Sequence, residues 1–125
     1  MHAGLFNIGG EGQMYLGGLG MGPVESMVVM ESMGHGIVLE PLSQTLICSA
    51  TLQTHAPAAL QAAWLPRIAA GEAIVVLAQQ ERGARYQLDR CAAVASESGG
   101  TWTVSGTKSV VAIGDQADAF VVPAT

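Results

Sequence analysis

The sequence predicts an α+β fold, in which a helical amino-terminal segment is followed by a partial antiparallel β-domain. Up to residue 70, apolar residues recur at the three- and four-residue intervals of a helix face. From residue 73 onward they form short β-branched runs or alternate with polar residues, as strands do. We therefore divide the chain into a glycine-rich lead-in (1–22), a helical segment (23–72) and a partial β-domain (73–125).

The lead-in holds eight of the sixteen glycines and neither lysine nor arginine. Glycine at this density disfavours a regular helix, so we expect a loop. Residues 4–13 resemble a stretch in the permeases of sugar or nucleoside importers. A permease needs several apolar spans of about 20 residues, and this sequence has none of that length.

The helical segment is expected to form three helices, over residues 23 to about 34, 42–52 and 58–70. Pro23 and Pro57 suit first turns, because the fixed φ of proline is helical and its missing N–H is not needed there. Pro66 predicts a kink or an early end of the third helix, and Gly71 suits the left-handed position that closes it. We expect the apolar stripe of the first helix to fill the core; its members are Val24, Met27, Val28, Met30 and Met33.

The β-domain begins with a short apolar run after Gly71, whose length and β-branched content favour a buried strand. The predicted strands are Ile74–Gln79, Cys91–Glu97, Thr101–Ser105, Lys108–Ile113 and Ala119–Pro123. Ser98, Gly99 and Gly100 predict a hairpin turn between the second and third strands.

Composition excludes several classes of function. The net charge is −5 with no basic block, which argues against nucleic-acid binding. The sequence shows no secretory signal pattern and no membrane span. Cys48 and Cys91 lack metal-type spacing, so we expect no metal site and two buried free thiols in a reducing compartment. Only 12% of residues are charged, where about 25% is typical, which predicts that part of the surface is normally covered.

Two blocks of sequence carry a family resemblance. Leu65–Glu72 reads LPRIAAGE, and Gln80–Tyr86 reads QERGARY after the short strand. Farther along, GTWTVSGTKSVV at residues 100–111 precedes GDQADAFVV at residues 114–122. Together they resemble the acyl-CoA dehydrogenases, in the bacterial branch with a G-A-R-Y loop, at the junction of the helical and β-domains. Tyr15 with Gly17–Gly20 resembles the Y-G-G-x-G loop of that family, so the likeness covers about residues 17–125.

The resemblance implies a fragment of an enzyme that oxidises the α–β bond of an acyl-CoA thioester with FAD as hydride acceptor. It implies flavin contacts from the end of the first strand and from a later stretch: Leu77, Ala78, Gln79, Gln80, Val110, Val111 and Ala112. It places Arg85 and Tyr86 near coenzyme A or the flavin phosphates, where a guanidinium suits oxyanions. Gln80 stands where the family has Thr or Ser. Val110–Ala112 replaces W-[IV]-[TS], so an ordinary interior strand is the competing interpretation of that stretch.

The resemblance implies no catalytic base in this sequence. In the family that carboxylate belongs to a carboxy-terminal helical domain, and the family role of Glu81 is structural. We therefore expect little activity and weak FAD affinity from this chain alone. The family also implies a cytoplasmic enzyme, a homo- or hetero-oligomer and electron transfer to an electron-transfer flavoprotein. The alternative hypothesis is a non-catalytic scaffold protein that associates with a full-length dehydrogenase subunit.

Overall fold

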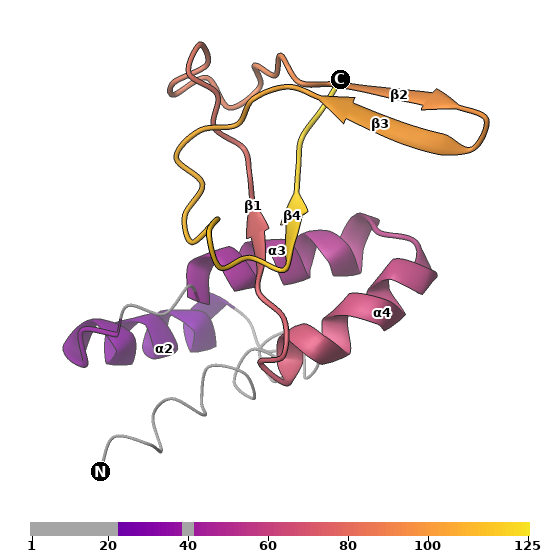
Figure 1. The fold of residues 1–125 in the computed structure, drawn as a ribbon. Helices are drawn as coiled ribbons and strands as arrows, with labels where there is room; N and C mark the ends of the chain where they lie inside the picture. Colours follow the sequence, from indigo (N-terminus) through magenta and orange to yellow (C-terminus); the bar gives the residue numbers. More distant parts are fainter. Residues whose placement is uncertain (1–22, 39–41) are drawn as a thin grey trace.

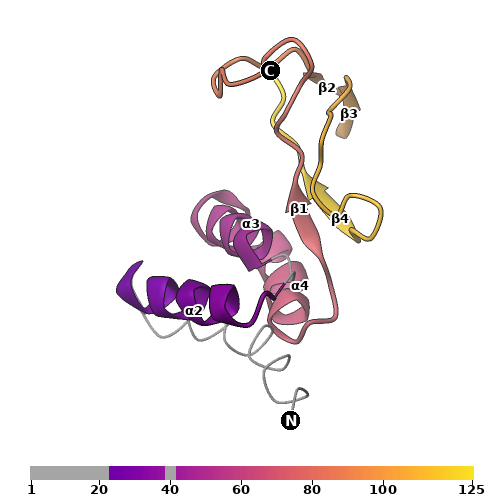
Figure 2. The ribbon, with the colours of Figure 1, turned by 90° about the vertical axis from the view of Figure 1, so that its left-hand side faces the viewer.

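The structure is a computed structural model that describes residues 23–38 and 42–125. The elements within those residues are α2 (Pro23–His35), α3 (Leu42–His55), α4 (Ala58–Ala69), β1 (Val75–Leu77), β2 (Val94–Ser98), β3 (Thr101–Ser105) and β4 (Ala119–Val121). The helices lie at one end and the β2–β3 hairpin at the other, with β1 and β4 between them (Figures 1 and 2). The predicted α+β class is confirmed. The predicted loop in residues 1–22 lies outside the described residues.

The core forms where α3 and α4 pack beneath β1. Its central cluster consists of Cys48, Ile68, Ala73 and Val75. Leu52, Trp64, Leu77, Ala119 and Val121 pack around this cluster. The guanidinium of Arg67 lies 4.9 Å from the centroid of the Trp64 ring and covers its solvent side as a cation–π contact. The start of the β-domain is therefore anchored to the helices, because Val75 of β1 belongs to this core cluster.

Gly71 closes α4 as the sequence predicts. Its φ is +72°, in the left-handed region that glycine adopts without cost. Its N–H donates to the Ile68 carbonyl at 3.1 Å, and the Glu72 N–H donates to the Arg67 carbonyl at 2.8 Å. These two bonds form a Schellman motif, which satisfies carbonyls at the helix end. Pro66 does not end α4 early, because the helix continues to Ala69.

The four described strands form two separate pairs. β2 and β3 are antiparallel and joined by Gly99 (φ +59°) and Gly100 (φ +79°), which gives the predicted tight hairpin. β1 and β4 pair in parallel, with Val75 opposite Ala119 and Leu77 opposite Val121. The sequence analysis expected antiparallel pairing throughout. Alternation in sequence shows which face of a strand is buried, but it does not show in which direction a distant partner runs.

The predicted strand Lys108–Ile113 is wrong. This stretch is a loop followed by a turn, in which the Gly114 N–H donates to the Val111 carbonyl at 3.2 Å. Val110 and Ile113 have φ values of +52° and +57°, which lie outside the β region. The other predicted strands exist, and three of them are shorter than the apolar runs that predicted them.

The expectation that the apolar stripe of α2 fills the core is wrong for four of its five members, whereas Met33 is half-buried. Val24, Met27, Val28 and Met30 are 67, 70, 58 and 46% exposed. Among the described elements, α3, α4 and the strands pack on one another, and α2 makes no comparable contact with them. Apolar residues occur on every side of α2, a pattern typical of a helix enclosed in a larger structure.

Gly34→Ala is expected to stabilise α2. Gly34 lies inside the helix, and a Cβ atom there would meet nothing within 4 Å. Alanine favours a helix over glycine by about 0.5–1 kcal/mol, so amide exchange in α2 should slow about two- to five-fold. Hydrogen exchange read by NMR checks this. Gly36→Ala is the control: Gly36 follows the helix, and its Cβ would press on Val38 Cγ2 at 3.2 Å, so this change should not slow exchange.

Candidate functional site

Two segments that the sequence assigned to cofactor binding lie side by side. β1 delivers Leu77–Gln80, and the chain after the hairpin returns through Lys108–Ala112. The Ala78 N–H donates to the Val121 carbonyl at 2.9 Å, and the Ser109 N–H donates to the Gln80 carbonyl at 2.8 Å. The first bond ties the end of β1 to β4, and the second joins the two segments in one wall, which we call the β1 wall and define as residues 77–80 and 109–112.

The side chains of the β1 wall differ in accessibility. Ala78 is buried, and Leu77 packs against the core cluster while its N–H donates to Gln44 Oε1 at 3.2 Å. Gln80, Val110 and Ala112 are exposed, with Val110 at 85%, whereas Gln79 and Val111 are half-buried. Gln80 and Val110 are therefore the side chains of the wall most available to a ligand, and Leu77 and Ala78 support them from behind.

The wall also stores backbone strain. Val110 and Ile113 are β-branched residues at left-handed φ, a conformation that such side chains rarely adopt. Strain of this kind costs about 1–3 kcal/mol per residue and concentrates at ligand sites and switch regions. Because the strained backbone at Val110 carries an exposed side chain, we regard the turn that follows Val110 as a candidate ligand site.

A basic loop leaves the wall at Glu81. The Ala84 and Arg85 N–H groups donate back to the Glu81 carbonyl at 3.0 and 3.3 Å, and Arg85 has φ +47°. Tyr86 is 94% exposed, and Gln79 Nε2 donates to the Leu88 carbonyl at 3.4 Å. Of the five lysines and arginines in the chain, three are exposed in this loop: Arg82, Arg85 and Arg90. The loop is thus a local concentration of positive charge in an acidic chain.

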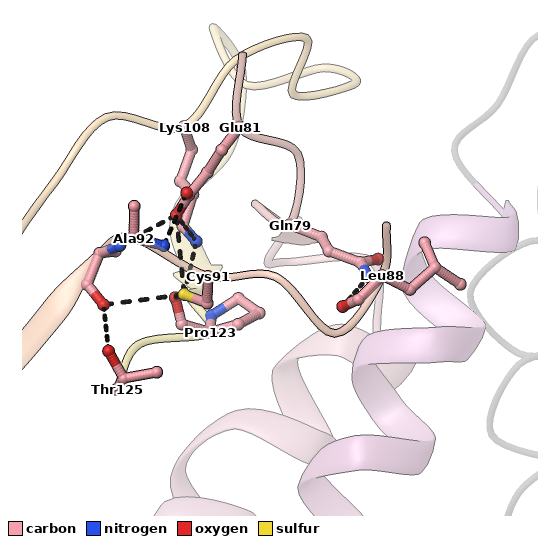
Figure 3. A network of polar contacts seen from close by, with 9 residues as sticks. Gln79, Glu81, Leu88, Cys91, Ala92, Lys108, Pro123 and Thr125 are labelled. Atoms are coloured by element: carbon pink, nitrogen blue, oxygen red, sulfur yellow. Dashed lines mark hydrogen bonds and ion pairs between the residues drawn. The ribbon is translucent and has the colours of Figure 1, made fainter. Parts of the chain in front are cut away.

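Behind the wall lies a buried polar group, which we call the junction cluster and define as Glu81, Cys91 and Lys108 (Figure 3). Lys108 Nζ lies 2.7 Å from Glu81 Oε1, and these side chains are only 9% and 8% exposed. The Ala92 N–H donates to Glu81 Oε2 at 2.7 Å, and the Ala93 N–H donates to Oε1 at 3.0 Å. Glu81 thereby joins the loop, the start of the hairpin and the returning segment.

The electrostatics of Glu81 fit a structural role. The hydrogen bond from Lys108, and then that from the Ala92 N–H, lower the pKa of Glu81 to about 2. Desolvation lowers the pKa of Lys108, but its hydrogen bonds to Glu81 and Cys91 outweigh this effect and raise it. A carboxylate that binds protons so weakly is a poor general base.

The sequence predicted a structural role for Glu81 but did not predict its partners Lys108 and Cys91. The lysine in the sequence GTK at residues 106–108 was a usable signal, whereas Cys91 offered none.

The free energy of unfolding is expected to fall between about pH 5 and pH 2 because of Glu81. Its pKa is about 2 in the folded chain against an ordinary value of 4.5, so the unfolded chain takes up the proton first. The stabilisation is complete above the unfolded value and disappears as the pH falls through the folded one. Urea unfolding across this range should show a weaker pH dependence for Glu81→Gln. Glu97→Gln, at an exposed β2 carboxylate, is the control; identical acid sensitivity of wild type and Glu81→Gln would contradict the assignment.

Two features of other functional classes are not found in the described part of the chain. No helix there has the length and apolar character that crossing a bilayer requires. The same residues bring together no group of three or more His, Cys, Asp or Glu side chains suited to a metal ion.

Comparison with known proteins identifies the family. The family described as "Acyl-CoA dehydrogenase, N-terminal domain" matches residues 3–72, more than half of the chain. The chain belongs to the acyl-CoA dehydrogenase family. A solved structure described as a variant of the Tcur3481–Tcur3483 steroid acyl-CoA dehydrogenase is also similar, with 29% identity and a TM-score of 0.78. No protein of curated function matches the chain.

The structural match extends the family assignment beyond the amino-terminal helices. It covers 98% of this acyl-CoA dehydrogenase chain, and therefore includes the β1 wall and the basic loop. It covers 34% of the matched chain, so this chain spans about a third of the length of that protein. The predicted resemblance is confirmed, and the comparison supports an oxidoreductase family.

Proposed function

We propose that this chain forms the flavin-facing wall of an FAD-dependent dehydrogenase that oxidises the α–β bond of an acyl-CoA thioester. The observation that carries the proposal is the 2.8 Å bond from the Ser109 N–H to the Gln80 carbonyl. It brings together the two segments that the family uses against the flavin, although they are far apart in sequence. The family assignment supports the proposed reaction, and the β1 wall is the proposed flavin-binding surface.

The exposed groups of the wall suit a flavin ring. Such a ring has an apolar body and a polar edge, and the wall offers the exposed Val110 side chain next to the exposed Gln80 amide. An amide can donate and accept hydrogen bonds, so it can take the place of the hydroxyl that is usual in the family. Gln79, Val111 and Ala112 complete the proposed contact, and Leu77 and Ala78 position its backbone.

FAD, when bound, supplies an acceptor for the hydride that leaves the β-carbon of the substrate. The role of this chain is to align the bond and keep water from that side. Glu81 does not remove the α-proton, because it is buried with Lys108. We propose that the base, the oligomer contacts and the docking of an electron-transfer flavoprotein come from outside the described residues. The two free thiols fit our proposal of a cytoplasmic location.

The basic loop is our proposed contact for the phosphates of coenzyme A or FAD. Arg85 is exposed beside Tyr86, and Arg82 and Arg90 add positive charge on the same loop. Guanidinium groups bind phosphate oxygens by paired hydrogen bonds, and Tyr86 adds an exposed ring and hydroxyl. The phosphate-bearing ligand would therefore lie beside the wall, where its reactive end can reach Gln80 and Val110.

NMR titration of the ¹⁵N-labelled chain tests the proposal even when affinity is weak. FAD should shift the amide signals of residues 77–80 and 109–112, and coenzyme A those of residues 82–90. Gln80→Ala should weaken FAD binding several-fold. Gln53→Ala, which removes an exposed amide on α3, should leave it unchanged. Unshifted wall signals at millimolar FAD, or equal binding by the two variants, would overturn the flavin assignment.

A further inference from the structure

Cys91 lies against charged groups rather than in an apolar pocket. Its Sγ is 3.4 Å from Lys108 Nζ, 3.6 Å from Glu81 Oε1 and 3.2 Å from the carbonyl oxygen of Pro123. Lys108 is the single lysine of the chain, and its side chain is 9% exposed. Its amine contacts both the sulfur and the Glu81 carboxylate, so the ion pair holds it beside Cys91. Figure 3 shows the sulfur among the side chains of the cluster, with dashed lines that mark its contacts.

The second thiol provides a contrast within the same chain. Cys48 is 0% exposed among the apolar residues of the core cluster, and burial raises its pKa to about 11. The thiolate is the reactive form of cysteine, so Cys48 is inert at neutral pH. Cys91 is only partly buried, which leaves it open to a small oxidant. Reaction should therefore be selective for the thiol that has an amine neighbour.

We propose that the junction cluster is a peroxide-reactive modification site, at which Cys91 is oxidised and then captured by Lys108 in a reversible sulfur–nitrogen bond. The proposal does not depend on the proposed function of the chain. A sulfenic acid is known to condense with a backbone nitrogen as a sulfenamide, and we extend this reaction to a neighbouring lysine amine. The structure supplies that nitrogen at 3.4 Å, already directed at the sulfur.

The reaction takes two balanced steps. In the first, the Cys91 sulfur attacks hydrogen peroxide: a sulfur–oxygen bond forms, the oxygen–oxygen bond breaks, and the second oxygen leaves as water with the thiol proton. Sulfur loses two electrons, and peroxide gains them. In the second, the Lys108 ammonium first gives one proton to solvent, which its ion pair with Glu81 makes less frequent but does not prevent, and the free amine attacks the sulfenic sulfur. The sulfur–nitrogen bond forms, and the hydroxyl leaves as water with a further nitrogen proton.

The modification has a consequence that ordinary thiol oxidation lacks. The sulfenamide nitrogen is uncharged, so Glu81 loses its ammonium partner and keeps only the N–H groups of Ala92 and Ala93. The oxidised chain should then unfold at a lower temperature than the reduced one, and thiol reductants should restore it. Lys108 and Glu81 adjoin Ser109 and Gln80, so the change acts directly behind the β1 wall.

Mass spectrometry of the full chain treated with hydrogen peroxide tests the proposal. We expect the intact mass to fall by about 2 Da, the loss of two hydrogens, and to recover with dithiothreitol. Fragmentation should locate the link between Cys91 and Lys108. Cys48→Ser should react as wild type does, and Cys91→Ser should not react.

A second variant separates capture by Lys108 from plain oxidation. Lys108→Arg keeps a cation for Glu81, but guanidinium stays protonated and does not attack sulfur. We expect this variant to stop at a sulfenic acid that dimedone traps. Wild-type chain that gains oxygen at Cys91 without the 2 Da loss would overturn the proposal. So would oxidation of Cys48 at an equal rate, or a mass that shows only disulfide-linked pairs of chains.

Discussion

Replacing Lys108 with methionine is expected to lower the melting temperature by about 5 °C or more. The change leaves the Glu81 carboxylate buried beside the half-buried Cys91 with only two N–H donors. An unpaired buried charge costs far more than an exposed ion pair contributes. Calorimetry or thermal circular dichroism measures the shift.

A double-variant cycle shows whether the pair itself is responsible. Glu81→Gln in the Lys108→Met background removes the stranded charge, and the amide oxygen can still accept from one of the two N–H groups of Ala92 and Ala93, so part of the lost stability should return. Arg82→Met removes an exposed cation and should change little. Additive losses in the double variant would contradict the idea that Lys108 acts by neutralising Glu81.

Gly106→Ala is expected to destabilise the chain by about 2–3 kcal/mol. A Cβ atom there would lie 2.7 Å from Ala93 Cβ and 2.8 Å from Ala93 Cα, closer than such atoms approach. Ala93 cannot retreat easily: its N–H donates to Glu81, and its carbonyl accepts from the Thr125 N–H at 2.9 Å. The added methyl group must therefore displace the backbone on which the junction cluster depends.

Urea unfolding tests this prediction through the midpoint. Gly83→Ala is the matched control, because a Cβ there meets nothing within 4 Å and the residue does not have a left-handed φ. It should change stability by less than about 0.5 kcal/mol, or raise it slightly by restricting the unfolded chain. Equal midpoints for Gly106→Ala and wild type would contradict the prediction, because they would show that a methyl group fits between Gly106 and Ala93 without strain.

The features that the sequence predicted well are those set by neighbouring residues. Pro23 begins α2, Gly71 ends α4 with a left-handed φ, and the glycine pair at 99 and 100 turns the hairpin. In each case the backbone needs a φ value that proline or glycine adopts at little cost and that few other residues can adopt as readily. The structural role of Glu81 was likewise visible in the motif, although the residue lies beyond the end of β1 at Leu77.

The features that the sequence predicted poorly depend on distant partners. The direction of β4 relative to β1 is decided by how the intervening chain returns, which no local pattern records. Residues 108–113 are apolar enough for a strand, but a hydrogen bond from Ser109 to Gln80 and two left-handed residues shape them otherwise. The proposed reactivity of Cys91 depends on its contact with Lys108, which is 17 residues away in sequence and is not visible before folding.

The parallel pairing of β1 with β4 also determines how the described β-domain would respond to a mechanical load. The chain enters β1 from the helices and leaves β4 toward Thr125, and both strands run the same way (Figure 1). Pulling the helices away from the carboxyl end therefore loads the bonds of this pair in shear, all at once rather than one after another. Those bonds include Ala78 to Val121 and Asp118 to Ile74. The hairpin lies between the two strands in sequence, but the backbone bonds of Thr125 to Ala93 and Ala95 pass part of the load to the start of β2 from the outset.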